Sequence, residues 1–183
     1  MRIYLDTGVF IDYLIYRSQA GSYLRNKGRR SRSVTDLFND ATECLNKIKR
    51  NHEGFTSCLT LVEAEETLYT TELRRSKGIP DRRRYIVISS RSFSDQILTM
   101  IDLFGFQIVD LSSQIVNRKA NDSAIHQRQI LARDALHLVT AIIHNADIII
   151  STDQDLLRLN TTLSNDNGLP IRCLDTNDAN RIL

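Results

Sequence analysis

The chain has 183 residues, of which 42% are hydrophobic and 25% charged, and its formal net charge is +2. This length suffices for one domain with a substantial apolar core, and the composition excludes a disordered or fibrous protein. The three cysteines show no CxxC spacing, so neither a zinc site nor a disulfide framework is indicated. No stretch approaches the roughly 20 apolar residues of a membrane span, and we expect a cytoplasmic protein without membrane contact.

The first half of the chain alternates short apolar runs with helical patterns. Strands are predicted at 2–5 (RIYL) and 55–58 (FTSC). Helices are predicted at 34–50, 60–75 and 84–104. Residues 17–33 are rich in glycine, serine and arginine, which favours a mobile loop over a core element. The stretch from Gly78 to Asp81 contains Pro80 and predicts a break between two helices.

The second half continues the same alternation. Strands are predicted at 106–109 (FQIV), 147–151 (DIIIS) and 171–174 (IRCL). Helices are predicted at 112–126, 130–145 and 153–159. Strands that alternate with helices imply an α/β fold with a central parallel sheet of about five strands, covered on both faces. Because strands of one sheet lie on both sides of every break, we expect residues 1–183 to form one domain that carries 17–33 as a basic loop insertion.

Acidic residues gather after the predicted strands, at the edge where ligand sites of parallel sheets lie. Asp6 follows the first strand, Glu63 opens the helix after the second, and Asp153 follows the fourth. Asp134 begins the helix that leads into the fourth strand. Polar or acidic neighbours of this group are Thr7, Thr152 and Asp155.

Two of these acids also have ordinary structural interpretations. Thr60 and Glu63 have the spacing of a capping box, and Asp134 is an acid at a helix N-terminus, a placement worth about 0.3–1 kcal/mol. As a cluster, however, the acids need an explanation, because two carboxylates about 5 Å apart repel by roughly 3 kcal/mol at an effective dielectric near 20. A bound cation offsets this repulsion, and oxygen ligands favour Mg²⁺ or Mn²⁺.

Three blocks of the sequence resemble PIN domains, and VapC-like toxins among them. Residues 3–14 (IYLDTGVFIDYL) look like the first strand and helix of that family. Residues 133–141 (RDALHLVTA) are similar to its Asp-Ala helix, and residues 148–156 (IIISTDQDL) resemble its fourth-strand exit. Order and spacing agree over essentially the whole chain. The sequence departs from the family at Gly8, where serine or asparagine is common, and in the greater length of 17–33.

The resemblance implies a three-layer α/β/α fold and Mg²⁺- or Mn²⁺-dependent hydrolysis of RNA. By position it implies catalytic and metal-binding roles for Asp6, Glu63, Asp134 and Asp153, a further metal contact from Asp155, and supporting roles for Thr7 and Thr152. A VapC-like toxin would also have a cognate antitoxin protein and form a homodimer, with the helices around 60–104 as candidate contacts.

Histidine chemistry is not required by this interpretation. His137 lies one turn after Asp134, and we interpret it as a packing or helix-surface histidine rather than a general acid. The other three histidines have no metal-ligand spacing.

Positive charge is concentrated in two segments. Residues 17–32 and 74–91 hold 13 of the 24 basic residues and a single acid, Asp81, so the rest of the chain is strongly acidic. Such segments are either solvated surface or contacts for RNA phosphates. The RNA-binding candidates are Arg25, Lys27, Arg29, Arg30, Arg32, Arg82, Arg83 and Arg84.

Other classes fit the sequence less well. A receiver-like module with Asp110 as phosphoacceptor would need an acid pair after the first strand, and a haloacid dehalogenase would need an aspartate where Gly8 stands. Two closer alternatives keep the fold: an RNA-processing nuclease without an antitoxin, and a non-catalytic scaffold that binds RNA or protein.

Overall fold

The computed structural model describes residues 1–183, apart from the side chain of Ala124. Within these described residues, five strands form one parallel sheet with the order β3-β2-β1-β4-β5. The strands are β1 (Arg2–Leu5), β2 (Glu53–Ser57), β3 (Gln107–Val109), β4 (Ile148–Ile150) and β5 (Arg172–Leu174). All five strand predictions are confirmed to within two residues at each end.

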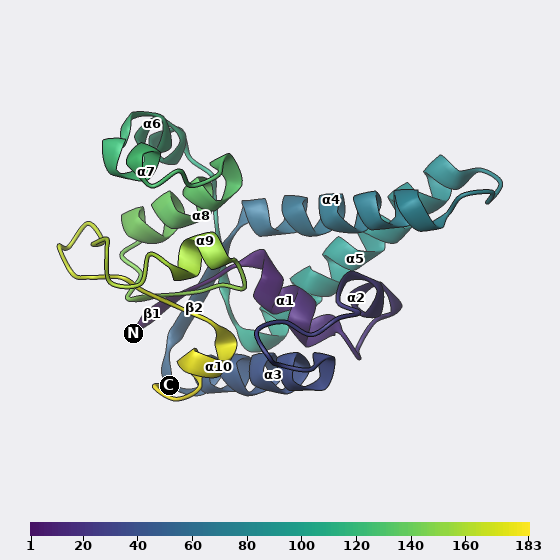
Figure 1. The fold of residues 1–183 in the computed structure, drawn as a ribbon, viewed down its shortest axis with the longest axis horizontal. Coiled ribbons are helices and arrows are strands. Elements are labelled where there is room, and N and C mark those ends of the chain that lie inside the picture. The colour runs from purple at the N-terminus through teal and green to yellow at the C-terminus, as the bar shows by residue number, and fades with distance from the viewer.

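Both faces of the sheet are buried, which explains the uninterrupted apolar runs. In the central strand β1, Tyr4 pairs with Phe55 of β2 and Ile149 of β4. The side chains of Ile3 and Leu5 enter one core and that of Tyr4 enters the other, because successive side chains of a strand point to opposite faces. The result is the predicted three-layer α/β/α arrangement (Figure 1).

Each face of the sheet has its own set of helices. One face is covered by α1 (Thr7–Leu14), α3 (Val34–Asn51), α4 (Cys58–Arg75), α5 (Arg82–Phe104) and α10 (Thr176–Ala179). The other is covered by α6 (Ser113–Asn121), α7 (Ser123–Gln127), α8 (Ala132–Ile143) and α9 (Gln154–Leu157). The single helix predicted for 112–126 is therefore wrong. Asp122 divides it, because its Oδ1 accepts the amide of Ile125 at 3.3 Å and so caps a new helix.

The basic segment 17–33 has more regular structure than we predicted. Residues Gln19–Leu24 form α2, which begins where the Ser18 hydroxyl accepts the amide of Gly21 at 2.9 Å. After it, Arg29 and Arg32 exchange backbone hydrogen bonds of 3.0 and 2.8 Å and close a tight turn. Part of the segment predicted as a loop is therefore helical, and its arginine side chains pair with carboxylates of the folded body, as described below.

Helices α4 and α5 form a long antiparallel pair that extends well beyond the sheet, with residues 76–81 at its tip (Figure 1). On and beside this tip lie exposed basic residues, Arg74, Arg75, Lys77, Arg83 and Arg84. None of the helices in the described residues is long and apolar enough to cross a membrane.

Candidate active site

The four acids singled out in the sequence line one cleft of about 560 Å³ at the carboxyl edge of the sheet. Asp6 follows β1 and Asp153 follows β4, and these two strands are neighbours. Glu63 comes from the first half of α4, and Asp134 comes from the first turn of α8. Four elements distant in sequence thus bring the carboxylates together.

Asp6 is held rigidly by its neighbours. It is the N-cap of α1, and its Oδ1 accepts the amide of Thr7 at 2.7 Å. Its Oδ2 accepts the hydroxyl of Ser151, at the end of β4, at 2.6 Å. The residue is only 7% exposed, so both oxygens have fixed positions at the floor of the cleft.

Glu63 belongs to the cleft and not to a capping box. Helix α4 begins at Cys58 with Ser57 as its N-cap, and the hydroxyl of Thr60 pairs instead with that of Thr56 at 2.7 Å. The Oε2 of Glu63 accepts the hydroxyl of Thr7 at 2.6 Å. The capping interpretation of Glu63 is therefore wrong, whereas the predicted supporting contact of Thr7 is present.

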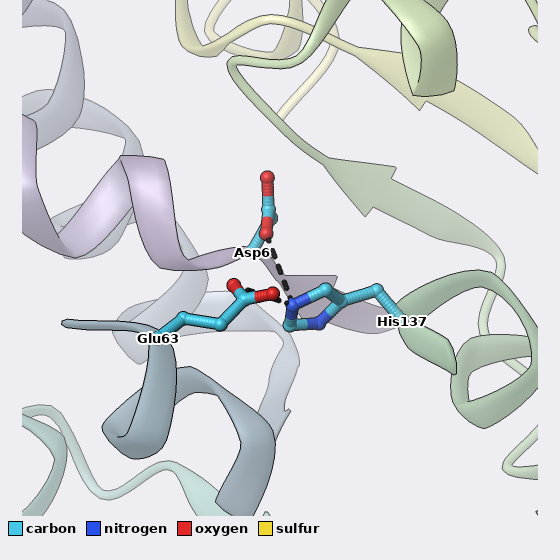
Figure 2. Close-up of side chains that lie close together, drawn as sticks. All are labelled: Asp6, Glu63 and His137. Carbon is cyan, nitrogen blue, oxygen red and sulfur yellow. Dashed lines mark hydrogen bonds and ion pairs between the residues drawn. The ribbon is translucent and has the colours of Figure 1, made fainter. Parts of the chain in front are cut away.

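His137, interpreted from the sequence as a packing or helix-surface histidine, is buried and lies against two of the cleft carboxylates. Its Nε2 lies 2.9 Å from Oε2 of Glu63 and 3.6 Å from Oδ1 of Asp6, so both carboxylates face the imidazole (Figure 2). Its Nδ1 lies 2.5 Å from the hydroxyl of Tyr4, which also contacts the Ser57 hydroxyl at 2.9 Å. The helical spacing Asp134-x-x-His137 places both side chains on one face of α8, and this was the signal in the sequence.

The ionisation of this group follows from its contacts. Burial by itself would lower the pKa of His137, but the hydrogen bond to Glu63 and the carboxylates of Asp6 and Glu63 outweigh it, and the pKa is raised. For Glu63, burial favours a higher pKa, but the hydrogen bond and the charge of His137 prevail, and the pKa is lowered. Glu63 is therefore held as a carboxylate by the imidazole of His137, which donates a hydrogen bond to it.

Asp134, Asp153 and Asp155 form a second cluster, in which one oxygen from each lies within 4.8 Å of the others. Asp153 is the N-cap of α9; its amide donates to Ser151 Oγ at 2.9 Å and its Oδ1 accepts the amide of Asp155 at 2.6 Å. Partial burial, followed by the charges of Asp153 and Asp6, raises the pKa of Asp134 to about 6. Burial is therefore the first cause of this rise, and the neighbouring carboxylates add to it.

The approach of this second cluster to α1 depends on Gly8. A Cβ built on Gly8 would lie 2.0 Å from the side-chain oxygen of Thr152, the residue before Asp153. Any side chain at position 8 would therefore displace Thr152, which lines the cleft beside Asp153.

Within the described part of the chain these acids have no lysine or arginine partner, although His137 faces Asp6 and Glu63. Among the described residues, no lysine or arginine lies within ion-pair distance of the Asp6, Glu63, Asp134 or Asp153 carboxylates. The neighbouring Asp155 faces Arg158 at 3.4 Å. Carboxylate oxygens with one imidazole nearby are a donor set that suits a hard divalent ion such as Mg²⁺ or Mn²⁺.

The basic candidates divide into two groups. The side chains of Arg25, Arg29, Arg30 and Arg32 form ion pairs of 2.5–3.2 Å with carboxylates of this chain. Their partners are Asp12, Asp40 and Asp175. By contrast, Lys27, Arg83 and Arg84 are exposed, and Arg82 is half-buried, with its Nε donating to Ser76 Oγ at 3.1 Å.

Comparisons with known proteins bear on the fold and the family. A family model described as PIN domain matches residues 3–161, whereas no curated protein sequence gives a significant match. One similar solved structure is the VapBC2 complex from Rickettsia felis bound to a DNA fragment from its promoter. The matched chain is 14% identical with a TM-score of 0.52, over 94% of this chain and 98% of that chain, so the likeness concerns the fold. With the match of the family model to most of its length, the chain belongs to the PIN-domain family of nucleases.

Proposed function

We propose that this protein is a metal-dependent ribonuclease that hydrolyses RNA phosphodiester bonds with Mg²⁺ or Mn²⁺. The observation that carries the proposal is the convergence of Asp6, Glu63, Asp134 and Asp153 in one cleft, where no lysine or arginine of the described residues pairs with them. A divalent ion would offset their mutual repulsion, and Asp155 lies close enough to Asp134 and Asp153 to contribute a further oxygen.

The chain's own residues would hold the reacting groups in place. A bound divalent ion supplies a water of lowered pKa and stabilises charge that develops on the phosphate. The carboxylate of Asp6, held by Thr7 and Ser151, and that of Asp153, whose Oδ1 accepts the amide of Asp155, would present oxygens in fixed positions. Such rigid positioning lowers the reorganisation that the reaction requires.

His137 would act through Glu63. Buried between Tyr4 and Glu63, it fixes the carboxylate that faces the cleft, as a hydrogen-bonding partner behind a metal ligand commonly does. Its 1% exposure leaves no open path to a substrate, which favours positioning over proton transfer to the RNA.

RNA phosphates would contact the basic tip of the α4–α5 pair, where Arg82, Arg83 and Arg84 lie. From Glu63 to the end of α4 the helix rises about 18 Å, so a strand bound at both places would extend several nucleotides beyond the cleft. The measured quantity is the slope of the logarithm of RNA affinity against the logarithm of salt concentration. Replacing the three arginines together by glutamine should make this slope less steep by about two. An unchanged slope would contradict this role.

The substrate assay tests the catalytic proposal directly. RNA is incubated with Mg²⁺ or Mn²⁺, with and without chelator, using the wild type, Asp6→Asn, Asp134→Asn and the exposed control Asp178→Asn. We expect cleavage only by the wild type and the control, and only with metal. Equal cleavage by all four proteins would contradict the catalytic assignment of Asp6 and Asp134. No cleavage by the wild type would contradict the proposal and leave the non-catalytic RNA- or protein-binding scaffold.

The biological role that we propose is that of the toxin in a toxin–antitoxin pair, which the likeness to VapBC2 supports. An antitoxin protein would then cover the cleft, and the toxin would form a homodimer. The alternative is an RNA-processing nuclease without an antitoxin. Expression of the wild type should arrest growth and that of Asp6→Asn should not. Normal growth at high expression of an active enzyme would favour RNA processing.

A further inference from the structure

The guanidinium of Arg30 bridges two strand exits. Its Nη1 lies 2.5 Å from Oδ2 of Asp175, the residue that follows β5. Its Nη2 donates to the backbone carbonyl of Thr152 at 2.8 Å, and its Nε donates to Oε1 of Gln154 at 3.1 Å. All three nitrogens are therefore engaged within the chain.

The two contacts on the β4 side enclose Asp153. Thr152 and Gln154 are its immediate neighbours in sequence, so the guanidinium fixes the backbone before Asp153 and the side chain after it. Asp175, on the other side of the bridge, is itself only 8% exposed and is held by Arg29 at 3.2 Å and by the amide of Thr176 at 2.7 Å. The bridge thus ties the loop of Asp153 to a rigid support.

The backbone at Arg30 is strained in a way that these contacts maintain. Arg30 and Ser31 have φ angles of 49° and 60°, in the left-handed region that favours glycine. Both lie between Arg29 and Arg32, whose mutual hydrogen bonds close the turn. An arginine in this position costs more backbone energy than a glycine would, and what it adds is the planar fork that reaches Asp175, Thr152 and Gln154.

We propose that Arg30 is a positioning residue of the cleft, which sets the place of Asp153 by clamping the 152–154 loop to Asp175. The inference rests on the proposed function in one respect, the metal-binding role of Asp153. It differs from the RNA contact expected of Arg30 from the sequence, because the guanidinium nitrogens are engaged by Asp175, Thr152 and Gln154 of the chain itself. Through Arg30, the segment 25–32 then contributes to the structure of the cleft.

Electrostatics and positioning predict opposite effects of removing Arg30, which makes the test decisive. A positive charge near the cleft opposes cation binding, so charge alone predicts tighter metal binding after its removal. Loss of positioning predicts weaker binding, by about 10-fold, as is common when a residue behind a metal ligand is replaced. Lysine keeps the charge but lacks the fork, so only positioning predicts weaker binding in Arg30→Lys.

The experiment measures Mn²⁺ affinity by calorimetry for the wild type, Arg30→Gly, Arg30→Lys and Ser31→Gly. Glycine at position 30 suits the left-handed backbone, so it removes the guanidinium without unfolding the turn, and glycine at 31 is the matched control with the guanidinium intact. We expect affinity about 10-fold weaker in both Arg30 variants and unchanged in Ser31→Gly. Tighter or unchanged binding in Arg30→Gly, or an equal loss in Ser31→Gly, overturns the proposal.

Hydrogen exchange in the metal-free protein separates this proposal from the function itself. The amides of Asp153 and Asp155 are hydrogen-bonded within the loop, to Ser151 Oγ and to Asp153 Oδ1. They should exchange faster in Arg30→Gly than in Ser31→Gly. If the wild type binds no Mn²⁺ but this difference appears, the proposed metal site is wrong and the positioning role of Arg30 is supported. If the difference is absent, the positioning role of Arg30 is wrong, whether or not Mn²⁺ binds.

Discussion

Two exits of the sheet carry the same Asp-Thr pair in the same local structure. Asp6 follows β1, caps α1 and accepts the amide of Thr7 at 2.7 Å; Asp175 follows β5, caps α10 and accepts the amide of Thr176 at 2.7 Å. Their exposures, 7% and 8%, are also nearly equal. The surroundings differ, because Asp175 faces two arginines of the 25–32 segment whereas Asp6 faces His137 and lies in a cleft with other acids.

The difference shows that a buried carboxylate at a strand exit has two means of compensation. Asp175 and Asp12 are neutralised by Arg25, Arg29 and Arg30. The acids of the cleft have no arginine partner among the described residues; His137 faces two of them, and under the proposed function a divalent ion would offset the remaining charge. One edge of the sheet therefore contains a permanent ion-pair network beside a proposed metal site.

The largest expected effect concerns catalysis at Asp6. Asparagine keeps the shape, and its one oxygen can still accept the Thr7 amide, but its NH₂ cannot accept the Ser151 hydroxyl as the carboxylate does. It also removes a charge that would hold metal, so Asp6→Asn should lower the cleavage rate by about 10³-fold or more. The free energy of unfolding, measured in urea without metal, should change by less than about 1 kcal/mol. A large loss of stability would mean that Asp6 is a structural acid like Asp175.

Asp12 should show the opposite behaviour. It is fully buried in α1, with Arg25 at 2.8 Å and Arg29 at 2.5 Å. Asp12→Asn leaves both arginines with a neutral partner, so we expect urea unfolding to report a loss of about 3 kcal/mol or more. A change below 1 kcal/mol would mean that the network contributes little to the fold.

Metal should stabilise the folded protein through the cleft alone. At a Mn²⁺ concentration 100 times the dissociation constant, binding adds about 2.7 kcal/mol, seen as a higher melting temperature that chelator reverses. The shift should be lost in Asp134→Asn and kept in Asp178→Asn. An equal shift in both variants would place the ion elsewhere.

Asp175 should affect the cleft only indirectly and least. Asp175→Asn weakens the support of Arg30, so Mn²⁺ affinity should fall by about 10-fold or less, in the same direction as in Arg30→Gly. Combining Asp175→Asn with Arg30→Gly should add little to either single change, because both act through one contact. Fully additive losses in this double-mutant cycle would show separate effects.

Much of the fold could be predicted from the sequence, because strand and helix periodicity is local information. The runs at 2–5 and 147–151 were predicted as buried strands, and they pair with each other, buried, in the centre of the sheet. The division at Asp122 was missed because a capping side chain inside an apolar helical pattern looks like an ordinary polar residue. The structure in 17–33 was missed because its contacts are with distant parts of the chain: Ala20 and Leu24 pack against the core, and its arginines pair with distant carboxylates.

The sequence by itself determined the order of strands and helices and the placement of acids at the carboxyl edge, because both follow from short-range patterns and the parallel direction of the strands. Only the tertiary structure decided which acids share a cleft, that His137 joins them, and that Asp175 belongs with arginines instead. The physical reason is that compensation of charge is a matter of distance in space. Arg30 and Asp175 are 145 positions apart in the chain and in direct contact in the fold.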